Sequence, residues 1–209
     1  MSDTFAPVSC NSSLEILLAL ATLRDLCIFA WDVDSAYLHG KIDHDIYIQL
    51  PEGYCKPGKV AKLNKALYGL LEAACVWQED FEEKLRSLGL TPLGSDAGVF
   101  ISKSADGIAA IDTHIDDVTG ICSSEEEECK LKAGIQKFYK IKEKDTLKPF
   151  KVLGILVTRD THLGTLKLSQ SEYINSLPER LGMTDYNPIV TPVDKGAHFQ
   201  DNKDTLQQH

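Results

Sequence analysis

The stretch Ile111-Asp112-Thr113-His114-Ile115-Asp116-Asp117-Val118-Thr119-Gly120-Ile121-Cys122 decides the fold of this chain. Apolar residues flank the adjacent acids Asp116 and Asp117 on both sides, as in two strands joined by a turn. Carboxylates buried without partners are costly, but at a turn both side chains can reach a divalent cation. A further acid, Asp32, follows the apolar run 27–31. Strand-end aspartates brought together by a fold suit two-metal phosphoryl chemistry, in which the ions lie about 3.5–4 Å apart.

Hydrophobic periodicity and turn residues predict the elements around this hairpin. Helices are expected over 14–23, 73–88, from 125 towards Phe138, and 169–181, and strands over 27–31, 46–50, 99–101, 108–111, 118–122, 152–157 and 165–168. The first helix is apolar nearly all round, which predicts burial on every side. The segment 62–67 is ambiguous. This order of elements argues for an α+β domain with an antiparallel sheet and helices packed on one face.

The charge of the chain is unusual for a protein that would bind phosphates. The chain has 209 residues, 43% of them hydrophobic, and a formal net charge of −9, whereas nucleic-acid binding favours a basic surface. The segment 130–151 nevertheless carries eight lysines against Glu143 and Asp145. Two interpretations stay open for it: a basic face, or a solvated helix surface followed by a loop.

The cysteines and the hydropathy exclude several classes of protein. The six cysteines are Cys10, Cys27, Cys55, Cys75, Cys122 and Cys129, with no CxxC pair and no zinc-ligand spacing. The N-terminus has no signal-peptide pattern, and no stretch reaches the roughly 20 apolar residues of a membrane span. We expect an intracellular protein with reduced thiols and no membrane partner.

Several blocks in a fixed order carry a family resemblance. WDVDSAYLHG at 31–40 is similar to a family pattern MDVKTAFLNG, IYIQLPEGY at 46–54 to IYMEQPEGF, and LNKALYGL at 63–70 to LKKSLYGL, with further matches at 3–8, 153–155, 168–174 and 191–192. By these blocks the chain resembles the reverse transcriptase domain of copia-type retrotransposon polyproteins, from Asp3 to about Asp194. An Asp-Asp pair alone could be ordinary turn chemistry, and an unrelated metal-dependent nucleotidyltransferase would share the acids without the other blocks.

The resemblance implies a right-hand polymerase fold. Residues 1–148 would form partial fingers and the palm, and residues 149–194 the palm edge and the thumb region. The polar tail 195–209 is expected to be disordered. The chain begins after the fingertip segment of its relatives, and the RNase H and integrase regions of a parent polyprotein are expected but absent here.

The resemblance also implies roles for single residues. Asp32, Asp116 and Asp117 would be the catalytic acids and the metal ligands, with Asp32 and Asp116 holding two Mg²⁺ ions (or Mn²⁺) and Asp117 supporting them. Tyr37 matches the aromatic residue that blocks a ribose 2′-hydroxyl, and Glu72 lies on the nucleotide side. The expected partners are an RNA or DNA template with its primer, and deoxynucleotides. The expected location is the cytoplasm or virus-like particles, or else the nucleus.

Departures from the family pattern leave enzymatic activity open. Leu71, Glu72, Ala74 and Cys75 stand where the family has Lys, Gln, Pro and Arg, and His114 replaces a Tyr. Glu72 beside a triphosphate adds repulsion between like charges. Asp34 replaces a Lys, and it either raises carboxylate pKa values or attracts a cation. Two functions therefore stay open: an RNA-directed DNA polymerase domain, and a catalytically degenerate or co-opted palm with a non-enzymatic binding role.

Overall fold

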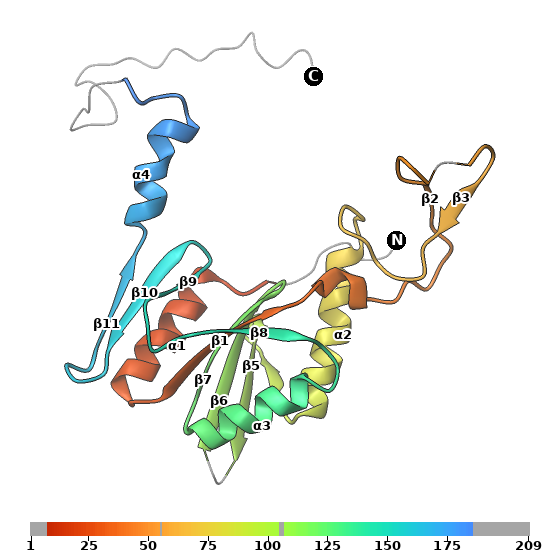
Figure 1. Cartoon of the computed structure of the whole chain (residues 1–209). Coiled ribbons are helices and arrows are strands. Elements are labelled where there is room, and N and C mark those ends of the chain that lie inside the picture. Colours follow the sequence, from red (N-terminus) through yellow and green to blue (C-terminus); the bar gives the residue numbers. More distant parts are fainter. Residues whose placement is uncertain (1–7, 55, 105–106, 186–209) are drawn as a thin grey trace, which may run out of the picture. The chain divides into compact units, whose positions relative to one another are not determined.

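The computed structural model describes residues 8–54, 56–104 and 107–185 (Figure 1). The helices are α1 (Asn11–Leu23), the 3-10 helix η1 (Ala36–His39), α2 (Ala73–Ser87), α3 (Glu125–Ile135) and α4 (Ser171–Arg180). The strands are β1 (Cys27–Val33), β2 (Tyr47–Gln49), β3 (Val60–Lys62), β4 (Thr91–Leu93), β5 (Asp96–Ser104), β6 (Gly107–His114), β7 (Asp117–Cys122), β8 (Ile141–Lys144), β9 (Phe150–Val152), β10 (Ile155–Asp160) and β11 (Thr165–Ser169).

A six-stranded antiparallel sheet forms the centre of the chain, in the order β4-β5-β6-β7-β1-β8. The expected α+β class with an antiparallel sheet is confirmed. The expected strands 99–101, 108–111 and 118–122 lie within β5, β6 and β7, and the expected strand 27–31 lies within β1. The edge strands β4 and β8 were not expected, because their short charged or proline-containing sequences lack an apolar alternation.

Both faces of this sheet are covered. On one face Phe29, Trp31 and Ile111 pack with Trp77 of α2 and Ile135 of α3. On the other face α1 packs through Leu14, Leu17, Leu18 and Ala21 against Ile28, Ala30 and Ile121. Figure 1 shows α1 and α3 on opposite sides of the strands. The expectation of helices on one face therefore holds for α2 and α3 and is wrong for α1, because alternate residues of the central strands are apolar on both sides.

The first helix is less buried than its composition predicts. Ile16 and Leu23 are exposed, whereas the four residues that face the sheet are buried. The helix needs only one apolar stripe for its contact with β1, β6 and β7. The prediction of burial on every side is therefore wrong for the outer side of this helix, where apolar residues are exposed.

The helix α2 has the expected bounds to within one residue, and α3 begins where its sequence predicts but ends earlier. The expected stripe of α2 is buried through Trp77, Phe81 and Leu85, and Gly89 follows the helix with a φ of +85°. The Ser124 hydroxyl accepts a hydrogen bond from the Glu127 N–H at 3.2 Å and caps α3. Phe138, however, lies beyond the end of α3 and is 43% exposed.

A three-stranded sheet, in the order β11-β10-β9, completes the part of the chain that ends at Gln170. Phe150, Val152 and Val157 enter the same core as α1. The compact unit thus continues through β11, and the assignment of residues 149–194 to the palm edge and thumb stays a prediction. The tail 195–209 lies outside the described residues, as do the matched blocks 3–7 and 191–192.

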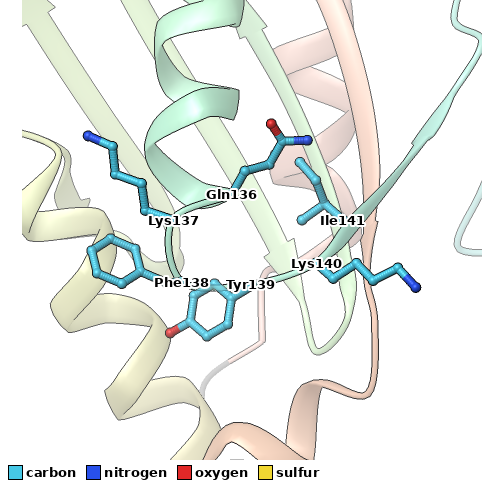
Figure 2. Close-up of a pocket in the computed structure, with 6 residues that line it drawn as sticks. All are labelled: Gln136, Lys137, Phe138, Tyr139, Lys140 and Ile141. Carbon is cyan, nitrogen blue, oxygen red and sulfur yellow. The ribbon is translucent and has the colours of Figure 1, made fainter.

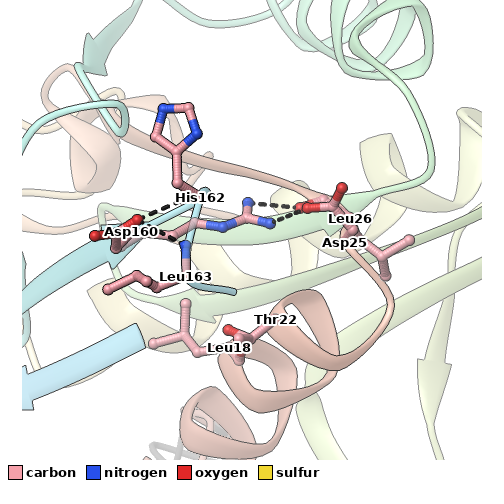
Figure 3. Close-up of polar contacts among 8 residues, drawn as sticks. Leu18, Thr22, Asp25, Leu26, Asp160, His162 and Leu163 are labelled. Carbon is pink, nitrogen blue, oxygen red and sulfur yellow. Dashed lines mark hydrogen bonds and ion pairs between the residues drawn. The ribbon is translucent and has the colours of Figure 1, made fainter. Parts of the chain in front are cut away.

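Arg159 of β10 ties this smaller sheet to the turn between α1 and β1. Its guanidinium donates to the Leu26 carbonyl at 2.7 Å and to Asp25 Oδ1 at 2.9 Å. Figure 3 shows Asp25 and Leu26 facing the turn residues Asp160, His162 and Leu163. The Arg159 side chain is only 13% exposed, whereas that of Asp25 is 91% exposed. The bond to the Leu26 carbonyl therefore contributes more than the solvated ion pair.

Two further pieces complete the description. The strands β2 and β3 form an antiparallel hairpin, and β2 lies within the expected strand 46–50. The second compact unit begins at Ser171 and contains α4, which carries the expected Tyr173, Ile174 and Leu177. No helix among the described residues is long and apolar enough to cross a membrane.

Replacing Arg159 by Met should lower the free energy of unfolding by about 1–3 kcal/mol, because the Leu26 carbonyl loses a charged donor. Urea denaturation measures this loss. The matched control is Arg86→Met, which removes an exposed i,i+4 pair with Glu82 and should cost about 0.5 kcal/mol or less. Equal losses in the two variants would contradict the role given to Arg159.

Asp112 of β6 is a buried acid near the start of α1. It is 2% exposed, and its Oδ1 makes no hydrogen bond. Burial, with a smaller contribution from the charge of Asp96, raises the pKa of Asp112 to about 6. The Ser9 hydroxyl opposes this shift, but neither its Oγ nor Asp112 Oδ1 makes a hydrogen bond of good geometry.

The raised pKa of Asp112 predicts a loss of stability with rising pH. The folded chain holds the proton up to about pH 6 and the unfolded chain only to about 3.8, so the free energy of unfolding falls across this window by roughly 3 kcal/mol. In Asp112→Asn this fall should be absent, so that the variant is the more stable protein above pH 6. Urea denaturation across this pH range measures it, with the exposed Glu52→Gln as control. A parallel pH profile for Asp112→Asn and the unmodified chain would contradict the prediction.

Candidate functional site

The Asp-Asp segment forms a tight hairpin turn between β6 and β7. His114 pairs with Asp117 across the hairpin, which leaves Ile115 and Asp116 as the two turn residues. Ile115 has a φ of +60°, as the first position of such a turn requires. The indole N–H of Trp77 donates to the Ile115 carbonyl at 2.9 Å. A helix in the core thereby fixes the backbone of the acidic turn.

Asp32 lies beside this turn. In the antiparallel pairing of β1 with β7, Asp32 is the direct partner of Asp117, and the Val33 N–H donates to the Asp116 carbonyl at 2.8 Å. Directly opposite residues of antiparallel strands have Cα atoms about 4.5–5.5 Å apart and share one face of the sheet. The structure therefore brings Asp32 together with the Asp116-Asp117 pair at one end of the ladder.

Lysines of β8 and of the loop before it pair with Asp117 and with the nearby Asp34. Lys144 Nζ lies 2.6 Å from Asp117 Oδ1, with both side chains about one-third exposed. Asp34 pairs with Lys140 at 3.4 Å and Lys142 at 3.7 Å, and a hydrogen bond from Lys140 with the charge of Lys142 lowers the pKa of Asp34. Of the two effects expected of Asp34, the attraction of a cation is thus the one that the structure contains.

The lysine-rich segment does not form a free basic face. At least six of its eight lysines make ion pairs: Lys130 with Glu126, Lys132 with Glu143, Lys140 and Lys142 with Asp34, Lys144 with Asp117, and Lys148 with Asp145. The helix-surface interpretation holds for its start in α3, and the rest includes the strand β8. These lysines mainly compensate the acids of the chain itself.

Tyr37 lies on η1, next to the acidic turn. Burial and then the negative charge of Asp116 raise the pKa of its phenol. Its ring contacts that of Tyr68 at a centroid distance of 4.7 Å, and it packs against the core on the α2 side of the sheet. Tyr37 therefore belongs to the neighbourhood of Asp116.

Glu72 precedes α2 and faces the segment before β2. Its Oε1 accepts no hydrogen bond and lies 3.4 Å from His44 Nε2, which is an ion-pair distance. A hydrogen bond to Asp43, and to a lesser extent the charge of Glu72, raise the pKa of His44. Glu72 therefore faces a histidine whose placement there no sequence pattern predicted.

The chemistry of these side chains suits a hard cation. Among the described residues no three or more His, Cys, Asp or Glu side chains gather into a metal-binding group. Mg²⁺, however, is usually held by one or two carboxylates together with substrate phosphates. Asp32 lies on the strand next to the Asp116-Asp117 pair, so carboxylates for such a site are close together, and the Lys144 ammonium already places a positive charge at Asp117.

A shallow hollow of about 410 Å³ lies on the loop after α3 and is lined by residues 136–141 (Figure 2). Figure 2 shows the Phe138 and Tyr139 rings on one side of this loop. Tyr139 donates to Asp80 at 2.7 Å and stacks edge-on against Trp77 at 5.1 Å. The hollow therefore marks the aromatic packing behind the acidic turn.

Sequence reasoning missed two residues of this neighbourhood. Trp77 was expected to be core without further role, yet its indole N–H holds the turn; the helical stripe predicts its burial but not the direction of its N–H. Lys144 was one lysine among eight, and only the pairing of β8 with β1 brings it to Asp117.

Comparisons with known proteins bear on the family of the chain. The family described as reverse transcriptase (RNA-dependent DNA polymerase) matches residues 1–195. The retrovirus-related Pol polyprotein from transposon TNT 1-94 of Nicotiana tabacum is 31% identical over 195 residues, which are 91% of this chain and 14% of that protein. The Pol polyprotein from transposon RE1 of Arabidopsis thaliana is 30% identical over 92% of this chain and 13% of its own length.

Two further similarities are more distant. The putative transposon Ty5-1 protein of Saccharomyces cerevisiae is 27% identical over 165 residues, 78% of this chain and 53% of that protein. A solved structure of apo telomerase from Candida tropicalis aligns over 78% of this chain and 41% of its own, with 10% identity and a TM-score of 0.45.

The chain spans about one-seventh of the length of the two plant polyproteins. The family match nevertheless covers almost all of it. The chain belongs to the reverse transcriptase (RNA-dependent DNA polymerase) family, in the branch of the copia-type transposon Pol polyproteins.

Proposed function

We propose that this chain is the palm of an RNA-directed DNA polymerase and that it transfers nucleotides onto a primer 3′-hydroxyl. The observation that carries the proposal is the direct pairing of Asp32 with Asp117 beside Asp116. Acids that lie far apart in the sequence meet at one corner of the sheet, in a chain that belongs to the reverse transcriptase family. Phosphoryl transfer needs positioning and charge stabilisation more than covalent chemistry, and this corner supplies both.

Each of the three acids has a proposed role, which comes from the family resemblance. Asp32 and Asp116 are proposed to ligate two Mg²⁺ ions, or Mn²⁺, with Asp117 in support. Bound ions of this kind lower the pKa of the attacking hydroxyl and neutralise the charge of the leaving pyrophosphate. In the chain alone, Lys144 balances the charge of Asp117 and holds that side chain in place.

Tyr37 and Glu72 are proposed to face the incoming nucleotide. Tyr37 lies close enough to Asp116 for the carboxylate to raise its phenol pKa, and a flat ring there can exclude a ribose 2′-hydroxyl by its size. Glu72 is proposed to lie on the nucleotide side, where protonated His44 reduces its repulsion of a triphosphate.

The proposed partners come from the family to which the chain belongs. They are a primed RNA or DNA template and deoxynucleotides, with RNase H and integrase regions in a parent polyprotein. We propose the cytoplasm or virus-like particles as the location, with the nucleus as the alternative.

A catalytically degenerate or co-opted palm is the second candidate. It is favoured by Leu71, which replaces a family lysine and is 84% exposed, and by Cys75, which replaces an arginine and faces Glu79 at 3.6 Å. Neither replacement offers a positive charge to a triphosphate. The candidate predicts binding without nucleotide incorporation.

Primer extension on a primed RNA template with Mg²⁺ or Mn²⁺ tests the proposal. The chain should add deoxynucleotides, and Asp116→Asn should reduce the rate by on the order of 10³-fold or more, because a metal ligand is lost. The control is Glu126→Gln, an exposed acid of α3 that pairs with Lys130, which should keep the rate of the unmodified chain.

Two results of this assay would contradict the proposal. No extension by the unmodified chain, under conditions in which an intact relative extends the same primer, would leave the degenerate palm as the better account. Extension that persists in Asp116→Asn would point to a contaminating polymerase or to other acids.

Replacing Glu72 by Gln should lower the KM for deoxynucleotides several-fold, because a negative charge facing the triphosphate is removed. It should also lower the pKa of His44, although Asp43 still holds that pKa above its ordinary value. The ion pair exists below the His44 pKa and is lost above it, so the difference in KM should grow as the pH rises. Steady-state kinetics across pH and NMR titration of His44 measure the two effects. An unchanged KM, with His44 shifted as expected, would place Glu72 away from the nucleotide.

A further inference from the structure

Two cysteines face each other across the strand pair that carries the acids. Cys27 begins β1, Cys122 ends β7, and the two are direct partners in the antiparallel register. Opposite residues on such strands have Cα atoms about 4.5–5.5 Å apart, which lies within the range of roughly 4.4–6.8 Å spanned by disulfides. Their side chains share one face of the sheet.

The two thiols lie close enough to interact. Cys122 Sγ donates its single proton to the Ser124 carbonyl at 3.3 Å, and its interaction with Cys27 lowers the pKa of the Cys27 thiol against the larger effect of burial. Both side chains pack on the face of the sheet that α3 covers. No large movement of the backbone is therefore needed to join them.

One of the two thiols can be reached from solvent. Cys122 is buried, whereas Cys27 is partly exposed. The strand β8 pairs with β1 only from Ala30 to Val33, so the edge of β1 at Cys27 carries no neighbouring β8 residue. A small reagent can therefore attack at Cys27, with Cys122 beside it to resolve the product.

We propose that Cys27 and Cys122 form a reversible cross-strand disulfide by exchange with a low-molecular-weight disulfide of the glutathione type. The Cys27 thiolate attacks the reagent, which forms a mixed disulfide and releases one thiol. The Cys122 thiolate then attacks the Cys27 sulfur, forms the cross-strand bond and releases the second thiol. Two protein thiols are oxidised, one reagent disulfide is reduced, and the two protons leave with the released thiols.

The surroundings of the thiols make this exchange slow at neutral pH. Burial, and then the charges of Glu125 and Glu128 on α3, raise the pKa of Cys27, while Arg159 on β10 acts in the opposite direction. Burial is also the main cause that raises the pKa of Cys122 to about 12. Because the thiolate is the attacking species, the rate of exchange should rise with pH.

The consequence for the fold is a covalent link between the two strands of the candidate site. The bond lies at the opposite end of the β1–β7 ladder from Asp32 and Asp117. It constrains the unfolded chain over the long loop between the two cysteines, and it leaves the acids free of direct contact with the new bond.

Glutathione redox buffers test the proposal on the full chain. The chain is equilibrated at alkaline pH, quenched with acid, alkylated, digested and analysed by mass spectrometry. A peptide pair joined through Cys27 and Cys122 should appear as the proportion of oxidised glutathione rises, disappear with dithiothreitol, and accompany an increase in Tm. A variant with Cys10, Cys55, Cys75 and Cys129 replaced by Ser should give the same joined pair.

Two control variants test whether the joined pair depends on Cys27. Cys27→Ser should abolish the joined pair and the increase in Tm, whereas Cys129→Ser, which removes an exposed thiol, should change neither. Recovery of alkylated Cys27 and Cys122 at every redox ratio, or of stable mixed disulfides alone, would overturn the proposal. The primer-extension result does not affect this outcome, so the two proposals fail separately.

Discussion

The antiparallel pairing of β1 with β7 is the constraint on which the rest of the site depends. Its register is fixed by burial, because Phe29 and Trp31 face α2 and α3 while Ile28 and Ala30 face α1. A slip by one residue would reverse both sets. Gly120 reinforces the register, since a Cβ there would lie 2.2 Å from the Phe29 ring. The meeting of Asp32 with Asp117 is therefore set by hydrophobic packing and needs no bound metal.

The charges near the acids are balanced locally. The chain as a whole carries −9, yet Lys144 pairs with Asp117 and two other lysines pair with Asp34. A short, charged edge strand such as β8 is a suitable source of such lysines, because its side chains need not enter the core. The net charge of the sequence is consequently a poor guide to the field at this site, which is set by the nearest partners.

The sequence predicted those parts of the fold that rest on local signals. The acidic hairpin, the stripe of α2 and the Ser124 cap each depend on residues within a few positions of one another. The edge strand β8 was missed because it alternates charges instead of apolar residues. The partners of Glu72 and Asp117 were missed for a different reason: His44 and Lys144 arrive through tertiary pairing, which no local pattern encodes. The candidate site residues thus come from the family resemblance and their roles stay predictions, whereas their electrostatic environment could be seen only in the structure.

The departures from the family pattern bear on the choice between a polymerase and a degenerate palm. A sequence that drifts without selection places acids at random relative to existing cations, and half-buried unpaired acids then destabilise the fold. Here the two acidic replacements each have a partner: Asp34 pairs with Lys140 and Lys142, and Glu72 faces His44, whose pKa is raised. The replacements without compensation, Leu71 and Cys75, add no charge to the site. Compensation at the acidic positions is what continued selection on the fold would produce. This distribution favours a palm kept under selection, either as a polymerase or in a co-opted role, over one that drifts.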